Sequence, residues 1–172
     1  MSSLTPEVKT ELVEAIKKSY YNYSAICAYG SRIAGYARKD SDFDVIVVLK
    51  DYWPRIGYDY IDEEAKIAVL LVDEKTLRKD AEKGSLAEFA IGRLLNPFEP
   101  LEGEDFLRTV EKQYKKRVIK EGLEMLLSKY GDLAYELFIP PQYFLFQKLN
   151  SRYSLYPAVL YSFCRTYSED RK

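Results

Sequence analysis

Two aspartates that lie two residues apart are the best candidates for chemistry in this sequence. Asp42 and Asp44 flank Phe43 at the start of an apolar stretch that runs from Val45 to Leu49. In a β-strand, side chains two positions apart point to the same face, so both carboxylates would aim at one spot and Phe43 away from it. Two such carboxylates repel each other unless a cation lies between them. Because Mg²⁺ takes oxygen ligands and typically uses one or two carboxylates plus substrate phosphates, the spacing predicts a divalent-metal site.

A second feature, the Gly30-Ser31 pair, precedes these aspartates by about a dozen residues. Glycine lets the backbone approach a ligand closely, and the N–H groups at the start of a helix bind phosphate. A short helix over residues 31–38 is therefore predicted to follow Ser31. Together with the aspartate pair, this turn predicts a site for a metal-bound nucleoside triphosphate. Taken singly, each feature has a simpler interpretation, in which the glycine only turns the chain and the aspartates only begin a strand.

The elements that must position these residues follow from the hydrophobic pattern. Thr5, Pro6 and Glu7 combine a capping side chain, a proline at the first helical position and an acid in the first turn, so a helix is predicted from here to about Tyr20. Buried strands are predicted at residues 24–29 and 42–49, and a hairpin of two strands at residues 55–61 and 66–72. We therefore predict a small α/β core over residues 1–73.

The remaining part of the chain, residues 74–172, has helical periodicity. Helices are predicted at residues 74–83, 85–95, 104–129 and 132–138, with breaks at the proline-containing stretches 96–100 and 140–141. The predicted fold class is α/β (α+β): a small mixed sheet with helices, followed by a helical C-terminal half.

The composition limits both the chemistry and the setting. The sequence has no histidine, which excludes a Ser-His-Asp triad, a His general base and His-ligated zinc. The formal net charge of −1 argues against bulk electrostatic attraction to nucleic acid. Without a long apolar run or a signal-like start, the protein is expected to be cytoplasmic and not associated with a membrane. The high charged fraction and the 16 tyrosines are typical of a thermophile.

The segment over residues 30–48 resembles a known signature when it is taken as a whole. It is similar to the Gly-Ser…Gly…Ser-Asp-x-Asp motif of the nucleotidyltransferases of the DNA polymerase β superfamily, particularly the minimal prokaryotic and archaeal forms. The residues in register with the motif are Gly30, Ser31, Arg32, Gly35, Ala37, Arg38, Asp40, Ser41, Asp42 and Asp44. The likeness extends as a fold analogy to about residue 73, and residues 74–172 resemble no family that we recognise.

The resemblance implies transfer of a nucleoside monophosphate from a nucleoside triphosphate to a hydroxyl, with release of pyrophosphate. Asp42 and Asp44 would be the catalytic residues and would hold the cofactor, Mg²⁺ or Mn²⁺. The nucleotide-binding residues it implies are Gly30, Ser31, Arg32 and Ser41. The acceptor is left open between RNA, a protein and a small molecule. Such minimal enzymes also often work beside a helical protein partner.

One departure from the family pattern concerns a third acid on a later strand. In residues 66–73, the strand that matches by position, Ala68 stands where that acid is expected. Asp59, Glu63, Glu64 and Asp73 are the nearby acids that could replace it. The departure puts catalysis in question more than binding, so the alternative function is a catalytically weak nucleotide-binding or interaction module, such as the antitoxin-like member of a pair.

A third interpretation concerns the C-terminal part of the chain. Residues 138–168 contain no acid, and Lys148, Arg152 and Arg165 are interspersed among tyrosines. Basic and aromatic residues in this arrangement can bind single-stranded nucleic acid. The simpler alternative is a helical core with half-buried tyrosines.

Overall fold

The protein is described here by a computed structural model, which covers residues 4–62, 65–151 and 160–165. Helix α1 (Pro6–Ser19) comes first, and the Thr5 hydroxyl caps it by accepting a hydrogen bond from the Val8 N–H at 3.5 Å. Strands β1 (Tyr23–Tyr29) and β2 (Phe43–Leu49) follow, and β3 (Ile56–Asp62) and β4 (Lys66–Asp73) form the predicted hairpin. The predicted elements of the N-terminal part are thus confirmed, apart from the helix after Ser31.

The rest of the chain begins with helix α2 (Glu74–Lys83), a loop and the short 3-10 helix η1 (Ile91–Leu95). A short strand, β5 (Glu99–Glu102), then leads into the long helix α3 (Glu104–Tyr130). The 3-10 helix η2 (Gly131–Glu136) and helix α4 (Pro141–Ser151) follow, and residues 160–165 are also helical.

The sheet has five strands in the order β3-β4-β2-β1-β5. Strands β2 and β4 run parallel, and all other neighbours in the sheet run antiparallel. The sheet is therefore mixed, and with its helices it forms the predicted α/β fold. Strand β2 lies at its centre, which explains why Val45–Leu49 is apolar on both faces.

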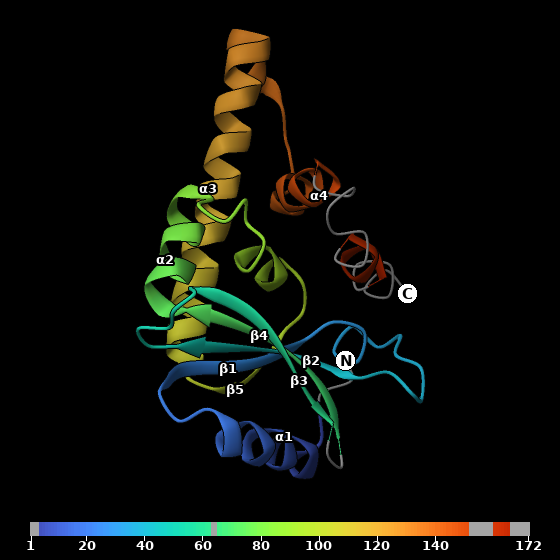
Figure 1. The fold of residues 1–172 in the computed structure, drawn as a ribbon. Coiled ribbons are helices and arrows are strands. Elements are labelled where there is room, and N and C mark those ends of the chain that lie inside the picture. The colour runs from blue at the N-terminus through green and yellow to red at the C-terminus, as the bar shows by residue number, and fades with distance from the viewer. Residues whose placement is uncertain (1–3, 63–64, 152–159, 166–172) are drawn as a thin grey trace.

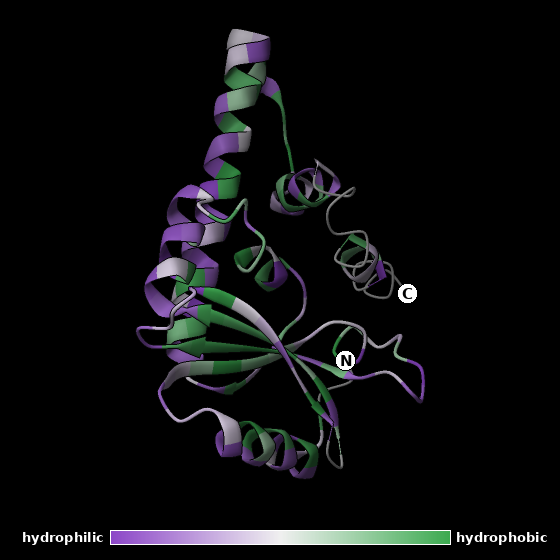
Figure 2. Ribbon diagram, viewed as in Figure 1, coloured by the Kyte–Doolittle hydropathy of each residue, from purple (hydrophilic) through white to green (hydrophobic). Residues whose placement is uncertain are grey.

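Helices cover both faces of the sheet (Figure 1). Helix α1 packs on one face, where Leu12 and Ile16 join a buried cluster with Ile26, Val45 and Val47. The other face is covered by α2, η1 and α3, whose buried side chains meet the alternate positions of the same strands. Hydrophobic residues are concentrated in the strands, while α3 is hydrophilic along much of its length (Figure 2). We call the second face, on which Asp44 lies, the α3 face.

Three predicted helices are wrong wholly or in part. Residues 31–35 form turns, closed by hydrogen bonds from the Ala34 N–H to the Gly30 carbonyl and from the Tyr36 N–H to the Ser31 carbonyl. Residues 85–90 are also turns, because Ala87 and Glu88 take positive φ angles that a helix does not allow. The predicted helix at residues 132–138 is the 3-10 helix η2.

Strand β5 lies in the stretch that was predicted to be only a break. It pairs with β1 alone, at the edge of the sheet, where Pro100 is tolerated because one side of the strand needs no ladder hydrogen bonds. The sheet thus takes its fifth strand from residues beyond 73. The division into residues 1–73 and 74–172 marks a change in secondary structure, and as a domain boundary it stays a prediction.

Candidate active site

Four residues form a row across the sheet on the α3 face. In the order of the strands they are Tyr60, Ala68, Asp44 and Tyr29, each in register with the next. Residues in register on neighbouring strands have side chains on the same face, with strands about 4.8 Å apart. Ala68 therefore lies directly beside Asp44, between Asp44 and the half-exposed Tyr60 in the row.

Burial and the repulsion between the two carboxylates both disfavour the ionised form of Asp44. Asp42 is exposed just before β2, whereas Asp44 is half-buried within it. Burial and then the negative charge of Asp42 raise the pKa of Asp44 to about 6, against the opposing charge of Arg93. A divalent cation between the two carboxylates would favour their ionised forms and so oppose this shift.

Gly30 follows β1 directly and lies against the Asp44 carboxylate. Its φ of +78° is a conformation that favours glycine, and a Cβ at this position would lie 2.1 Å from Asp44 Oδ2. The contact is possible only because residue 30 has no side chain. The backbone of the turn and one carboxylate of the pair are thus brought together, as the spacing of the motif predicts.

Arg32 and Ser41, which were predicted to bind nucleotide, make contacts within the loop between β1 and β2. The Arg32 Nε donates to the Ser41 carbonyl at 3.0 Å, and its guanidinium lies 4.2 Å above the ring of Phe43. Phe43 faces α1, so Arg32 lies on the side of β2 away from Asp44. Ser41 closes a turn, because its hydroxyl accepts from the Arg38 N–H at 3.0 Å. Ser31 stands at the first turn after Gly30.

Arg93 on η1 is a cation of the α3 face that the sequence did not single out. Its Nε donates to the Tyr29 hydroxyl at 3.1 Å, and its Nη2 donates to the Tyr58 hydroxyl at 3.1 Å. Its Nη1 donates to the Phe89 carbonyl, and the guanidinium lies 4.3 Å from the centroid of the Phe89 ring. Since Tyr29 is on β1 and Tyr58 on β3, these contacts span the two strands between them, β2 and β4.

Tyr29 links this cation to the aspartate pair. It is the neighbour of Asp44 in register, and Arg93 lies 5.5 Å above its ring. Burial raises the pKa of the Tyr29 hydroxyl to about 12, so it remains protonated near neutral pH. We call Arg93, Tyr29 and Tyr58 the arginine bridge.

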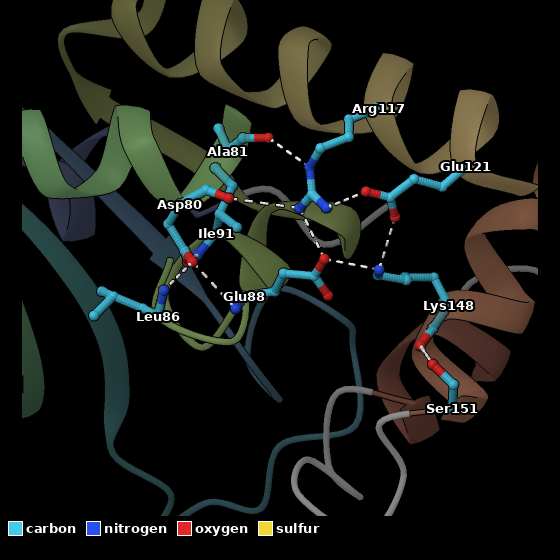
Figure 3. Close-up of polar contacts among 9 residues, drawn as sticks. All are labelled: Asp80, Ala81, Leu86, Glu88, Ile91, Arg117, Glu121, Lys148 and Ser151. Atoms are coloured by element: carbon cyan, nitrogen blue, oxygen red, sulfur yellow. Dashed lines mark hydrogen bonds and ion pairs between the residues drawn. The ribbon is translucent and has the colours of Figure 1, made fainter. Parts of the chain in front are cut away.

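The loop that delivers Phe89 and Arg93 is built around Asp80, a fully buried carboxylate of α2. Asp80 accepts hydrogen bonds from the N–H groups of Leu86 at 2.7 Å, Glu88 at 3.1 Å and Ile91 at 3.4 Å (Figure 3). Buried carboxylates need such donors, and backbone donors fix the loop that provides them. A single side chain of α2 thus sets the path of the chain into η1.

A second carboxylate of this loop, Glu88, anchors it to the two outer helices. It is 2% exposed and binds Arg117 of α3 at 2.7 Å and Lys148 of α4 at 2.8 Å (Figure 3). Burial raises the pKa of the Glu88 carboxyl, but hydrogen bonds from Lys148 and Arg117 outweigh this effect and lower the pKa overall. Glu88 is therefore ionised at neutral pH and holds α3, α4 and the loop together.

The carboxylates near the site suit one divalent ion. Among the described residues, no three metal-ligating side chains gather in one place. Two carboxylates completed by phosphate oxygens and water match the usual ligands of Mg²⁺. Asp42 and Asp44 are the residues that fit this role.

The acids that could stand in for the missing carboxylate lie elsewhere or outside the described residues. Asp59 points to the α1 face, where it binds the Tyr20 hydroxyl. Asp73 is at the far end of β4 and caps α2 by accepting from the Thr76 N–H at 2.9 Å. Glu63 and Glu64 lie outside the described residues.

The C-terminal residues considered for nucleic-acid binding are only partly described. Lys148 is engaged with Glu88 and Glu121, and the Tyr161 ring packs edge-on against Tyr36 with centroids 4.8 Å apart. Arg152, Tyr153, Tyr156 and Tyr167 lie outside the described residues. Across the part of the chain that is described, no helix has the length and apolarity needed to cross a membrane.

Comparison with known proteins defines the class. The family model of the nucleotidyltransferase domain matches residues 9–152, so the chain belongs to this family, within the polymerase β-like superfamily. The match continues through β5, α3 and α4, well past residue 73. No curated protein matches the sequence.

Among solved structures, the chain is similar to a nucleotidyltransferase-like protein from Exiguobacterium sibiricum. The two share 14% sequence identity, with a TM-score of 0.46 over 84% of this chain and 54% of that protein. The chain thus spans about half the length of this neighbour.

Proposed function

We propose that this protein transfers a nucleoside monophosphate from a nucleoside triphosphate to a hydroxyl group of an acceptor and releases pyrophosphate. The observation that carries the proposal is the packing of Gly30 against Asp44, with Asp42 two residues before it. Family membership supports nucleotidyl transfer in general. The arrangement of these three residues supports a metal-bound triphosphate as the donor.

In the proposed reaction, the acceptor oxygen forms a bond to the α-phosphorus as the bond between the α- and β-phosphates breaks. Asp42 and Asp44 hold Mg²⁺ or Mn²⁺, which neutralises phosphate charge when it is bound. The turn at Gly30 and Ser31 lets the phosphates come close to the backbone. Positioning and charge neutralisation can supply most of the rate enhancement of phosphoryl transfer, so the absence of histidine is no obstacle.

The proton of the attacking hydroxyl has no carboxylate acceptor on β4, because Ala68 stands beside Asp44. A positioned base typically contributes about 10²- to 10⁴-fold in rate. The proton therefore passes to solvent or to a group of the acceptor, and the isolated protein is expected to turn over slowly. RNA, a protein or a small molecule can each supply the acceptor hydroxyl, and a helical protein partner could complete the site.

The position of Ala68 also favours a second candidate function, a nucleotide-binding or interaction module with little activity. A transfer assay separates the two. Each of the four labelled ribonucleoside triphosphates is incubated with Mg²⁺ or Mn²⁺ and with RNA, protein and small-molecule acceptors. Label transfer that is lost in Asp44→Asn supports the enzyme, whereas triphosphate binding without transfer to any acceptor supports the module.

A further inference from the structure

The site described above has too few carboxylates to hold a pair of divalent ions, and an arginine already lies near it. Two ions about 3.5–4 Å apart need carboxylates to bridge them and to offset their mutual repulsion. Among the described residues on this face, the candidates are Asp42 and Asp44, and the next position in register is Ala68. A fixed cation, Arg93, lies within electrostatic range of Asp44.

The arginine bridge also gives this cation a defined position. Its guanidinium is half-buried, lies 4.3 Å from the Phe89 ring centroid, and is tied to hydroxyls on both sides of β2 and β4. Hydrogen bonds to a charged group are among the stronger ones in proteins, and a ring face adds cation–π attraction. The charge is therefore preorganised on the α3 face, tied to Tyr29, the neighbour of Asp44 in register.

We propose that Arg93 takes the electrostatic place of a second metal ion, so that the site binds its triphosphate with one divalent ion and one guanidinium. The inference rests on the proposed function. Asp42 and Asp44 hold the single ion, and Ala68, beside Asp44, adds no carboxylate that would repel the phosphate oxygens. Arginine suits this role because its planar guanidinium is always charged and can bind two phosphate oxygens at once.

The test counts metal ions and measures affinity, without relying on turnover. The full chain is saturated with a non-hydrolysable triphosphate analogue in Mn²⁺, and native mass spectrometry gives the number of Mn²⁺ ions in the complex. We expect one ion per bound analogue. Two ions per analogue would overturn the inference. If binding still depended on Asp44, the proposed function would stand.

The matched variants are Arg93→Met and Arg78→Met, measured by calorimetry with the same analogue and Mg²⁺. Arg78 is also stacked on a ring, 4.6 Å from the Phe106 centroid, and pairs with Glu74 at 3.1 Å, toward the opposite end of the sheet from Asp44. We expect Arg93→Met to weaken binding about tenfold or more, as for loss of one charged contact, and Arg78→Met to leave it unchanged. Arg93→Lys, which keeps the charge, should restore part of the loss.

The outcomes separate the two claims. Wild-type affinity in a folded Arg93→Met variant would overturn the role of Arg93, and if that variant does not fold, the metal count on the wild-type protein still decides. If the wild-type protein binds no triphosphate with either metal, the proposed function itself fails.

Discussion

At the scale of single residues, the proposed site rests on the contact between Gly30 and Asp44 as well as on the aspartate pair. A methyl group at Gly30 would overlap Asp44 Oδ2, whereas a methyl group at Gly35, which has nearly the same φ of +75°, would meet nothing within 4 Å. The two glycines share one backbone requirement and differ in their contact with the carboxylate. This pair of positions therefore separates backbone strain from displacement of Asp44.

We expect Gly30→Ala to abolish triphosphate binding and Gly35→Ala to keep it. Both variants should lose about 1–3 kcal/mol of stability, because alanine is disfavoured at positive φ. The measurements are calorimetry with Mg²⁺ and a triphosphate analogue, together with thermal unfolding. Equal binding losses in the two variants would mean that the turn, and not the contact with Asp44, is what matters.

The raised pKa of Asp44 predicts how the metal-free protein responds to pH. The pKa of the Asp44 carboxyl is about 6 in the folded protein and near 3.8 ordinarily, so folding favours its protonated form. Its stabilising contribution is full below pH 4 and is lost as the pH rises through 6. The side chain of Asp44→Asn does not titrate. In the presence of a chelator, this variant should therefore become more stable than the wild type as the pH rises through this range.

The expected gain of Asp44→Asn at neutral pH is about 1–2 kcal/mol, once solvent screening of this half-buried group is counted. Thermal unfolding of both proteins between pH 4 and 7.5 measures the difference. A difference that does not change with pH would show that Asp44 titrates as an ordinary exposed carboxyl.

At the scale of secondary structure, the sequence predicted the elements whose positions are determined by local sequence signals. Thr5 and Pro6 specify the start of α1, and the apolar runs specify β1, β2 and the hairpin. The loop at residues 85–90 and strand β5 were missed because tertiary contacts decide them. Asp80 forces the loop from a position buried in α2, and β5 forms only because β1 offers an edge.

The candidate site shows the same division. Gly30, Asp42 and Asp44 lie close together, as the motif predicts, because Gly30 directly follows one strand and the aspartates lie at the start of the strand that pairs with it. Arg93 could not be found this way, because it reaches the site through the Asp80 loop and η1, far along the chain. No local pattern distinguishes it from the other arginines of the sequence.

The buried ion pair between Glu88 and Arg117 is predicted to contribute more to stability than the exposed ion pairs of α3. Arg117→Met should lower the free energy of unfolding by about 3 kcal/mol, because it leaves the buried Glu88 charge with fewer partners. The control is Arg108→Met on the same helix, whose ion pairs with Glu104 and Glu111 are more exposed and should matter by about 1 kcal/mol or less. Chemical denaturation measures both, and similar losses in the two variants would contradict the role of the buried network.

The register of β2 and β4 predicts the effect of adding a third carboxylate. Ala68→Asp places an acid directly beside Asp44, so without metal the variant should be less stable than the wild type. With Mn²⁺ it should bind the ion several-fold more tightly and regain that stability. Binding unchanged from the wild type would mean that residue 68 does not face the metal.

At the scale of the whole molecule, both parts of the chain contribute residues to the proposed site. The sheet carries the aspartates and the glycine, while the segment between α2 and β5 carries Arg93, and both lie within the span of the nucleotidyltransferase domain at residues 9–152. Helices α3 and α4 hold this segment through Glu88. The helical part is thus a support for the site, beyond its role as cover for the sheet.

The most direct test of the account is Mg²⁺-dependent triphosphate binding by the full chain and by three aspartate variants. Calorimetry with a non-hydrolysable analogue is expected to show binding by the wild type and by Asp40→Asn, an exposed aspartate of the same loop. Asp42→Asn and Asp44→Asn should each weaken binding about tenfold or more, since each removes a charged ligand contact. Unchanged affinity in both of these variants would contradict the proposed site.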